Sequence, residues 1–411
     1  AYELIPDDAQ WLTSNGVNEI IIQSSRLGIY YDYAEKLVNM SKAYVCTCTA
    51  EELAIRRKES EAKGLPPKYD GRCRDIHQGK LPTGSQYVIR FRFPDTGKTI
   101  VRDLIRGDVE FDNALLDDFV ILKSDGFPTY NFACVVDDAE MDITHVIRGD
   151  DHLSNTPRQI RIFLALGWRQ PKYAHIPMIL GTDKTRLSKR HGATSVVEYD
   201  KIGYLSDAMV NYLARLGWGF GDQEIFSRQE LIDKFTLKRV VKTPAVFDMD
   251  KLLWLNGQYI RKMPLSDLIK VCEPLLKAAY EIRDTSNEQL SHIISSLHDR
   301  IRVIPDIVPL SKFYFIDDVQ VDPMAKLKYL DKPEALDILK KLKDRLEHTD
   351  PFTKDNIEKA FRGLAADLGI KAGDVIHPAR VALTGSAESP PMFDVVEILG
   401  KEKTLKRLSA I

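Results

Sequence analysis

One stretch of the sequence, residues 143–180, constrains the fold more than any other because it reads as strand, helix, strand. Residues 143–147 are a β-rich run, the following helix ends at Gly167, and residues 174–180 form a second apolar run. A strand–helix–strand unit of this length predicts two parallel strands. Ligands bind beyond the carboxyl ends of such strands. The sequence therefore predicts a ligand site at the loops that follow the two strands.

Both of these loops are polar and carry cations. The first contains Arg148, which suits bidentate recognition of a carboxylate, and we expect the hydroxyl of Tyr130 beside it. The second contains Arg186, Lys189 and Arg190, and such a group suits a polyphosphate whose charge grows in the transition state. The alternative for the second loop is a solvated basic turn, and residues such as Tyr130 and Arg148, taken singly, are more often structural than functional.

The rest of the chain divides into mixed and helical parts. Helical spacing covers 28–41, Thr49 and Glu52 predict a capping box, and period-two alternation marks strands within 86–93 and 119–123. Ser154 is the expected cap of the helix before Gly167, and at least one of the adjacent Asp137 and Asp138 is interpreted as a cap. From about residue 200 onward the periodicity is helical, and no strand is expected.

Three cysteines form the only thiol cluster that the sequence suggests. Cys46 and Cys48 are separated by one residue, and Cys73 follows downstream. Three thiolates with a fourth ligand would hold a tetrahedral Zn²⁺. Tyr69, Asp75 and His77 compete for the fourth position, and three ordinary buried thiols are the alternative to a metal site.

Composition excludes several classes of protein. No segment approaches the ~20 apolar residues of a membrane span, so we expect no membrane role. Five cysteines in 411 residues are too few for a disulfide framework, which favours a reducing compartment, the cytoplasm. A net charge of −2 excludes a broadly basic surface but leaves local nucleic-acid contacts possible. Walker A, G-x-G-x-x-G, HExxH and G-x-S-x-G motifs are all absent.

Several strings, in the right order along nearly the whole chain, resemble class I aminoacyl-tRNA synthetases, specifically bacterial-type glutamyl-tRNA synthetases. They are Ala43-Tyr44-Val45-Cys46-Thr47-Cys48, Pro67-Lys68-Tyr69-Asp70-Gly71-Arg72-Cys73, Pro128-Thr129-Tyr130-Asn131-Phe132, Thr144-His145-Val146-Ile147-Arg148-Gly149-Asp150-Asp151-His152, Arg186-Leu187-Ser188-Lys189-Arg190 and Ala379-Arg380-Val381-Ala382-Leu383-Thr384-Gly385. The resemblance implies ATP-dependent activation of L-glutamate, with Mg²⁺, and its transfer through glutamyl-adenylate to tRNA(Glu). It also implies an α/β fold with an incomplete Rossmann-type catalytic domain, an α+β insertion and an all-α anticodon-binding region, in a monomer.

The resemblance assigns domains and residues as expectations. Residues 1–43 and 128–182 correspond to the catalytic domain, 44–127 to an acceptor-stem-binding insertion with a zinc site, 183–263 to the signature loop and a helical stem-contact domain, and 264–411 to the anticodon-binding domain. The implied phosphate-stabilising catalytic residues are Arg186, Ser188, Lys189 and Arg190. ATP would contact Met178, Ile179, His152 and Lys189, and glutamate would be held by Tyr130 and Arg148. The tRNA would contact Asp151, Arg300 and Arg302. Zinc would be bound by Cys46, Cys48, Tyr69 and Cys73.

One part of the family pattern is missing. The H-x-G-H-type first signature and the L-R-x-E-D-T-D-like strand that follows it are absent from the sequence. We expect both to lie upstream of Ala1, so that the chain resembles a synthetase lacking its N-terminal signature segment, with impaired adenylation. The alternative is a fragment that acts only as a tRNA-binding module. Asp75 also replaces a histidine of some relatives, which leaves the fourth zinc ligand open.

Overall fold

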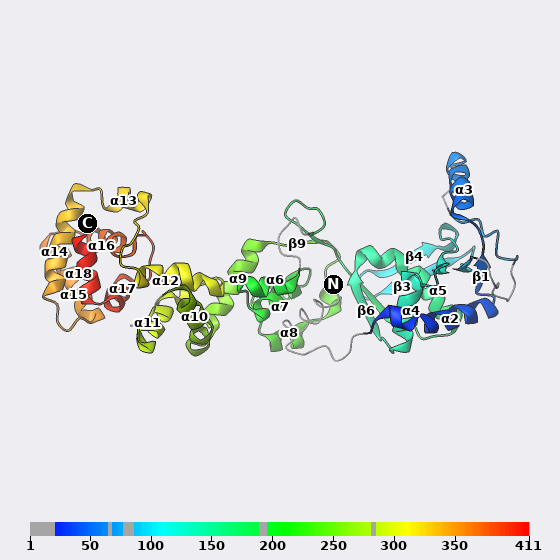
Figure 1. The fold of residues 1–411 in the computed structure, drawn as a ribbon, viewed down its shortest axis with the longest axis horizontal. Coiled ribbons are helices and arrows are strands. Elements are labelled where there is room, and N and C mark those ends of the chain that lie inside the picture. Colours follow the sequence, from blue (N-terminus) through cyan, green and yellow to red (C-terminus); the bar gives the residue numbers. More distant parts are fainter. Residues whose placement is uncertain (1–20, 65–67, 77–85, 189–194, 281–284, 411) are drawn as a thin grey trace. The chain divides into compact units, whose positions relative to one another are not determined.

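The computed structural model describes residues 21–64, 68–76, 86–188, 195–280 and 285–410 (Figure 1). The chain forms two compact units, and each is described by itself. The sheet unit comprises the described residues of 15–192 and 213–247, and the helical unit those of 193–212 and 248–411. Within the described residues, none of the helices combines the length and the apolar character needed to cross a bilayer.

A three-stranded antiparallel sheet in the sheet unit has the order β1-β2-β5. It consists of β1 (Ala43–Cys46), β2 (Val88–Phe91) and β5 (Val120–Leu122), of which β2 and β5 lie within the runs where the alternating pattern predicted strands. After β1, α3 (Ala50–Ala62) begins with the expected capping box, in which Thr49 accepts from the backbone of Glu52 and the Glu52 carboxylate accepts from Thr49. Helix α2 (Leu27–Asn39) packs its buried face, which includes Tyr30 and Leu37, against this region.

A second, four-stranded sheet contains the predicted parallel pair. Its order is β4-β3-β7-β6, with β4 (Gly107–Asp112), β3 (Lys98–Asp103), β7 (Lys172–Ile176) and β6 (His145–Gly149). Strands β6 and β7 are parallel and directly paired, with Arg148 opposite His175. Strand β3 pairs with β7 in parallel through Asp103 and Tyr173. Strands from the expected insertion therefore share one sheet with the strand–helix–strand unit.

The helix between the two parallel strands differs from expectation at its start. A 3₁₀ segment, η3 (Asp150–Asn155), includes Ser154, and α5 (Thr156–Leu166) begins after Asn155. The prediction that Ser154 caps this helix is therefore wrong, because a 3₁₀ turn takes up the residues between strand and helix. The expected end is confirmed, since Gly167 adopts the left-handed conformation, with φ 68°, at little steric cost.

Two other predictions need correction. The expected second strand, 174–180, is divided at Pro177, because β8 (Ile179–Leu180) is not part of the four-stranded sheet. Instead, β8 pairs in parallel with β9 (Ala245–Val246), a strand where none was expected. Asp137 and Asp138 cap nothing, because both lie inside α4 (Tyr130–Glu140). Helix α4 packs against α2 and α5. The sheet unit also contains α8 (Arg228–Lys234).

The described part of the helical unit has no strand, as the periodicity after residue 200 predicted. Its helices are α6 (Val196–Ile202), α7 (Ser206–Arg215), whose last three residues belong to the sheet unit, α9 (Met249–Lys262), α10 (Leu265–Ala279), α11 (Asn287–Leu297), α12 (Ile307–Phe315), α13 (Pro323–Tyr329), α14 (Pro333–Glu347), α15 (Lys354–Asp367), α16 (Ala372–Thr384), α17 (Met392–Leu399) and α18 (Lys401–Ser409). One apolar core runs through α10–α18 and includes Leu342 and Phe361. The buried Arg407 donates to three backbone carbonyl groups and ties α18 to this core.

Candidate active site

Arg148, near the end of β6, is the centre of the polar rim that the sequence predicted. Its Nε donates to His175 Nε2 at 3.2 Å. Its Nη2 donates to Thr156 Oγ1 at 2.9 Å and Gln159 Oε1 at 2.7 Å, and lies 3.4 Å from the carbonyl oxygen of His152. Its Nη1 lies 3.3 Å from Tyr130 Oη. The guanidinium group is therefore fixed on its inner side, while Nη1 faces the partly exposed hydroxyl of Tyr130.

Tyr130 and His152 complete this cluster from two other elements. Tyr130 is the first residue of α4 and is 52% exposed. Its Oη lies 3.4 Å from His152 Nδ1, and the ring centroids are 5.7 Å apart. Three of the predicted site residues thus lie within reach of one small ligand. A guanidinium nitrogen and a phenol hydroxyl can both donate hydrogen bonds, so the ligand group that they suit best together is a carboxylate.

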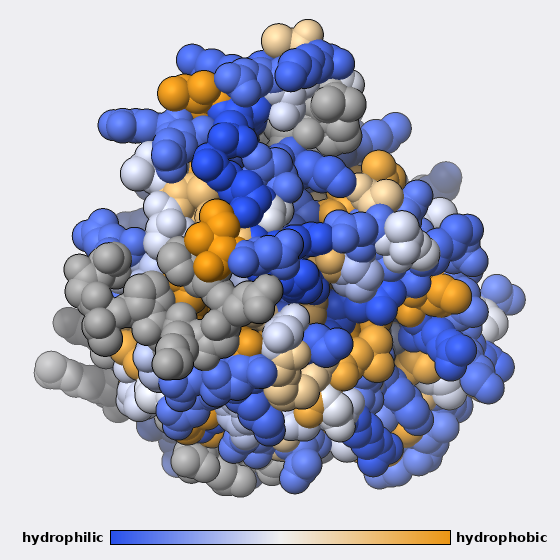
Figure 2. All heavy atoms as spheres, turned by 90° about the vertical axis from the view of Figure 1, so that its right-hand side faces the viewer, coloured by the Kyte–Doolittle hydropathy of each residue, from blue (hydrophilic) through white to orange (hydrophobic). Residues whose placement is uncertain are grey.

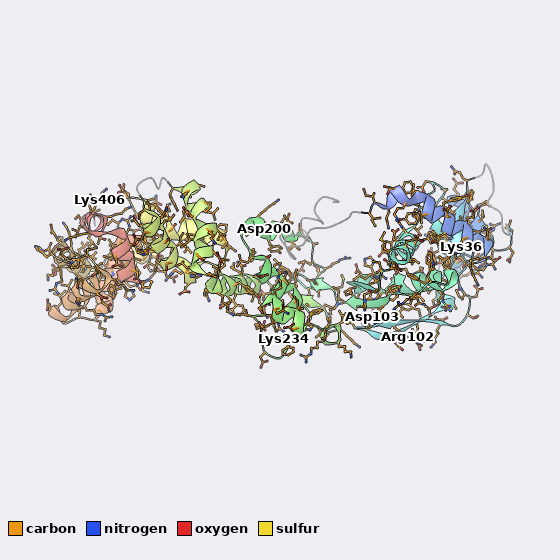
Figure 3. The ribbon with its side chains drawn as sticks, turned by 90° about the horizontal axis from the view of Figure 1, so that it is seen from below. Lys36, Arg102, Asp103, Asp200, Lys234 and Lys406 are labelled. Carbon is orange, nitrogen blue, oxygen red and sulfur yellow. The ribbon has the colours of Figure 1, made fainter. Side chains whose placement is uncertain are left out.

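Two buried residues that the sequence did not predict are linked to Arg148 by hydrogen bonds on its inner side. His175, on β7, has a fully buried side chain, and its Nδ1 lies 2.6 Å from Oδ2 of Asp103, whose side chain is also fully buried. Asp103 is the last residue of β3 (Figure 3). Burial alone would raise the pKa of Asp103, but hydrogen bonds from His175 and from two backbone N–H groups hold it below its usual value. The signal available in the sequence was a lone histidine inside an apolar strand.

The loop after β6 is connected to the basic loop by an ion pair. Arg186 Nη2 lies 2.9 Å from Asp151 Oδ2, and Arg106 Nη2 lies 2.6 Å from Asp150 Oδ2. Gly149 makes room for this arrangement, because a Cβ there would lie 2.5 Å from Asp151 Oδ1. The structure therefore brings Arg186 to the rim that holds Arg148. Two other predicted cations of this loop, Lys189 and Arg190, lie outside the described residues.

The remaining residues expected to contact ATP, Met178 and Ile179, lie just before β8 and at its start. The carbonyl of Met178 accepts from the N–H of Ala245 at 3.2 Å, and the carbonyl of Ile179 accepts from Leu187 at 3.0 Å. Both carbonyls are thus engaged within the sheet unit. Ser188 is exposed at the end of the described part of the loop.

The thiol cluster assembles as predicted, with its three sulfur atoms close enough together to be ligands of one metal ion. The sulfur atoms of Cys46, Cys48 and Cys73 all lie within 4.8 Å of one another, and Cys48 Sγ and Cys73 Sγ are 3.5 Å apart. Tyr69 Oη lies 3.4 Å from Cys46 Sγ and 3.8 Å from Cys48 Sγ. A tetrahedral ion with Zn–S bonds of about 2.3 Å holds its sulfurs about 3.8 Å apart, so this donor set fits zinc.

The candidates for the fourth zinc ligand differ in where their side chains lie. Asp75 is directed elsewhere, since its carboxylate pairs with Arg92 at 3.1 Å and its side chain is 79% exposed. His77 lies outside the described residues. The guanidinium of Arg90 lies 3.9 Å from the centre of the Tyr69 ring. Tyr69 is therefore the candidate that the described residues place beside the thiols.

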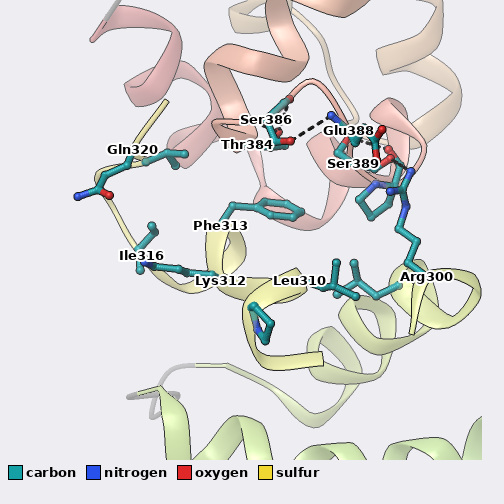
Figure 4. A pocket seen from close by; sticks show the side chains of 14 residues that line it. Arg300, Leu310, Lys312, Phe313, Ile316, Gln320, Thr384, Ser386, Glu388 and Ser389 are labelled. Carbon is teal, nitrogen blue, oxygen red and sulfur yellow. Dashed lines mark hydrogen bonds between the residues drawn. The ribbon is translucent and has the colours of Figure 1, made fainter. Parts of the chain in front are cut away.

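The two arginines expected to contact tRNA lie in the helical unit. Arg300 lines a cavity of about 250 Å³ together with Phe313 and Glu388, and its Nη2 donates to the carbonyl of Ser389 (Figure 4). Arg302 is exposed, and its backbone N–H donates to Asp306 Oδ2 at 2.9 Å. Figure 2 shows a different face, the side of Figure 1 on which α2 and α3 of the sheet unit are labelled, and that face is mostly polar with scattered apolar side chains.

Comparisons with known proteins cover the whole chain. The family model for the catalytic domain of class I tRNA synthetases (E and Q) matches residues 1–254, and the anticodon binding domain model matches 267–411. The chain is 48% identical over 412 residues to the glutamate–tRNA ligase of Thermodesulfovibrio yellowstonii, covering 100% of this chain and 88% of that protein. It is 46% identical over 406 residues to that of Syntrophobacter fumaroxidans, covering 98% and 86%.

A solved structure agrees. A glutamate tRNA ligase from Elizabethkingia meningosepticum, in complex with its amino acid, superposes with a TM-score of 0.86 at 31% identity, covering 99% of this chain and 88% of that one. The catalytic-domain match does not favour the alternative of a module that only binds tRNA. The expected fold class, a class I catalytic domain followed by a helical anticodon-binding region, is confirmed. On this evidence the chain belongs to the glutamate–tRNA ligase family of class I aminoacyl-tRNA synthetases.

Proposed function

We propose that the site around Arg148 and Tyr130 holds L-glutamate during ATP-dependent ligation to the 3′ end of tRNA(Glu). The observation that carries the proposal is that one guanidinium nitrogen of Arg148, Nη1, faces Tyr130 instead of the partners that hold the rest of the group. Its Nε and Nη2 are engaged by His175, Thr156 and Gln159, whereas Nη1 faces Tyr130 Oη at 3.3 Å. A carboxylate placed there receives a charge-assisted hydrogen bond from the guanidinium and a second from the phenol.

The proposed chemistry has two steps. A carboxylate oxygen of glutamate attacks the α-phosphorus of ATP and pyrophosphate leaves, giving glutamyl-adenylate; a hydroxyl of the terminal tRNA ribose then attacks the carbonyl carbon and AMP leaves. Arg186 and Ser188, with Lys189 and Arg190 by resemblance, stabilise the charge of the departing pyrophosphate. The segment at Met178 and Ile179 lies against adenine, and His152 lies beside the adenylate. Mg²⁺ supplies neutralisation of phosphate charge when bound.

The tRNA contacts and domain roles extend the proposal. Asp151 lies near the tRNA terminus, and Arg300 and Arg302 contact the anticodon region. We keep the expected domain boundaries: 1–43 with 128–182, 44–127, 183–263 and 264–411, as catalytic, acceptor-stem, stem-contact and anticodon-binding parts. The protein acts as a monomer in the cytoplasm; the five cysteines form no disulfide, as expected in a reducing compartment.

Arg148→Lys tests the glutamate assignment. Lysine keeps the charge but loses the planar fork that His175, Thr156 and Gln159 hold, so we expect the KM for glutamate in aminoacylation to rise about 10- to 100-fold. The KM for ATP should stay within about twofold. Arg161→Lys is the matched control, because Arg161 also hydrogen-bonds within the sheet unit but contacts Thr99 and Lys98 instead. An unchanged glutamate KM in Arg148→Lys would refute the assignment.

Zinc bound by Cys46, Cys48, Cys73 and Tyr69 would give structural support to the insertion. Metal analysis of the purified protein tests this without reference to activity. We expect about one zinc per chain, lost in Cys73→Ser and retained in Cys134→Ser, since Cys134 lies on α4 outside the cluster. Equal zinc content in the two variants would contradict the site.

A further inference from the structure

Three neighbouring parallel strands place one residue each in a line that ends at the glutamate site. Asp103 ends β3, His175 lies in β7 and Arg148 lies in β6, and His175 is the register partner of Arg148. Asp103 Oδ2 lies 2.6 Å from His175 Nδ1, and Arg148 Nε lies 3.2 Å from His175 Nε2. The carboxylate, the imidazole and the guanidinium therefore form one hydrogen-bonded chain.

The direction of each hydrogen bond follows from the chemistry of the donors. A guanidinium group only donates, so His175 Nε2 accepts from Arg148 and carries no proton. The single ring proton of a neutral imidazole then lies on Nδ1, which donates to Asp103. The hydroxyl of Thr156 lies 3.1 Å from the same Nε2, which is consistent with an acceptor there. The geometry thus selects one tautomer of His175.

The carboxylate of Asp103 has no freedom to turn away. Its Oδ2 accepts from His175 Nδ1 and from the backbone N–H of His175 at 3.0 Å. Its Oδ1 accepts from the backbone N–H groups of Ile105 at 2.9 Å and Arg106 at 2.8 Å. Four donors therefore surround the two oxygen atoms, and the side chains of both Asp103 and His175 are fully buried.

We propose that Asp103 and His175 are positioning residues for glutamate: Asp103 fixes the tautomer of His175, and His175 Nε2 then holds Arg148 so that Nη1 meets the substrate carboxylate. The inference rests on the proposed role of Arg148. Neither residue touches the substrate. Asp103 comes from the segment expected to be the acceptor-stem insertion, so that segment contributes to amino-acid recognition as well.

Asp103→Asn is the decisive perturbation because an amide cannot satisfy four donors. In either orientation its NH₂ group faces donors, either two backbone N–H groups or His175. If His175 moves its proton to Nε2 in response, that proton opposes the N–H of Arg148. We expect the KM for glutamate to rise about 10- to 100-fold, with the KM for ATP within about twofold.

The matched control is Asp118→Asn. Asp118 is also a buried carboxylate of the sheet unit that binds several donors, but these are Tyr44, Arg74 and the backbone of Phe93. The same chemical change there should leave the glutamate KM within about twofold. A general loss of packing would affect both variants alike, whereas a positioning role affects only Asp103→Asn.

A double-mutant cycle separates this inference from the proposed function. If Asp103 acts through Arg148, adding Asp103→Asn to Arg148→Lys should change the glutamate KM by less than about twofold. Additive effects, or a glutamate KM in Asp103→Asn no higher than in Asp118→Asn, would overturn the inference. If Arg148→Lys alone leaves the KM unchanged, the proposed function fails instead.

A second pair of variants serves if Asp103→Asn does not fold. His175→Gln retains an acceptor within reach of Arg148, whereas His175→Leu retains none. We expect the glutamate KM of the glutamine variant to lie at least about fivefold below that of the leucine variant. Equal KM values in the two variants would contradict a positioning role for His175.

Discussion

Two adjacent aspartates on α4 have different surroundings, and changing each to asparagine should have opposite effects on stability. Burial raises the pKa of Asp138 to about 6; the nearby charge of Arg148 opposes this rise and that of Asp137 adds to it. Asp137, by contrast, accepts hydrogen bonds from Gln23, Arg26 and Tyr30 at 2.8–3.0 Å. The first carboxylate is ionised at a cost to the fold, whereas the second stabilises it.

The sign and size of the Asp138 effect follow from linkage. A raised pKa in the folded state means that the fold binds this proton more tightly than the unfolded chain does, so stability falls as pH rises from about 4 to about 6. A shift of about two pKa units corresponds to about 3 kcal/mol. Because Asp138 is only partly buried, we expect about 1–2 kcal/mol after solvent screening.

Urea unfolding of the two variants and the parent protein measures this difference. At about pH 7.5, Asp138→Asn should raise the unfolding free energy by about 1–2 kcal/mol, and the gain should disappear near pH 4. Asp137→Asn should lower it by about 2–3 kcal/mol at neutral pH because Arg26, Gln23 and Tyr30 lose an ionised partner. A destabilising or pH-independent effect of Asp138→Asn would refute the argument.

Two further predictions concern the helical unit. Arg407→Met keeps the apolar stem but removes the donor of three carbonyl groups, of which those of Leu383 and Phe313 are buried, so the unfolding free energy should fall by about 3 kcal/mol; a loss below about 1 kcal/mol in urea unfolding would contradict this account. Gly203→Ala should cost about 3 kcal/mol or more, since Gly203 has φ +96° and a Cβ there would lie 2.2 Å from Pro305 Cδ. Gly369→Ala, at φ +65° with open space around it, should lower the unfolding free energy by only about 1 kcal/mol in urea unfolding.

Local patterns in the sequence predicted several of the elements and the exposed part of the site. The parallel pair, the capping box at Thr49 and the approach of Tyr130 to Arg148 follow from hydrophobic period, turn residues and the rule that ligands lie beyond strand ends. The thiol cluster followed from spacing and from the chemistry of zinc. These features depend on residues that are close together in the chain or on one topological rule, and they can therefore be predicted from the sequence.

What the sequence alone determined, therefore, was the parallel strand pair, the helical character of the helical unit and which polar side chains lie at the end of the sheet; β9 was not predicted. Tertiary structure alone decided that β3 joins β7, which brings Asp103 to His175, and that the run at 174–180 breaks at Pro177. It also decided that Asp137 binds Tyr30 of α2 and Arg26, the residue just before α2. The reason is physical: a buried polar group must find its partner within hydrogen-bond distance, and that partner is fixed by strand register and helix packing rather than by its position in the sequence.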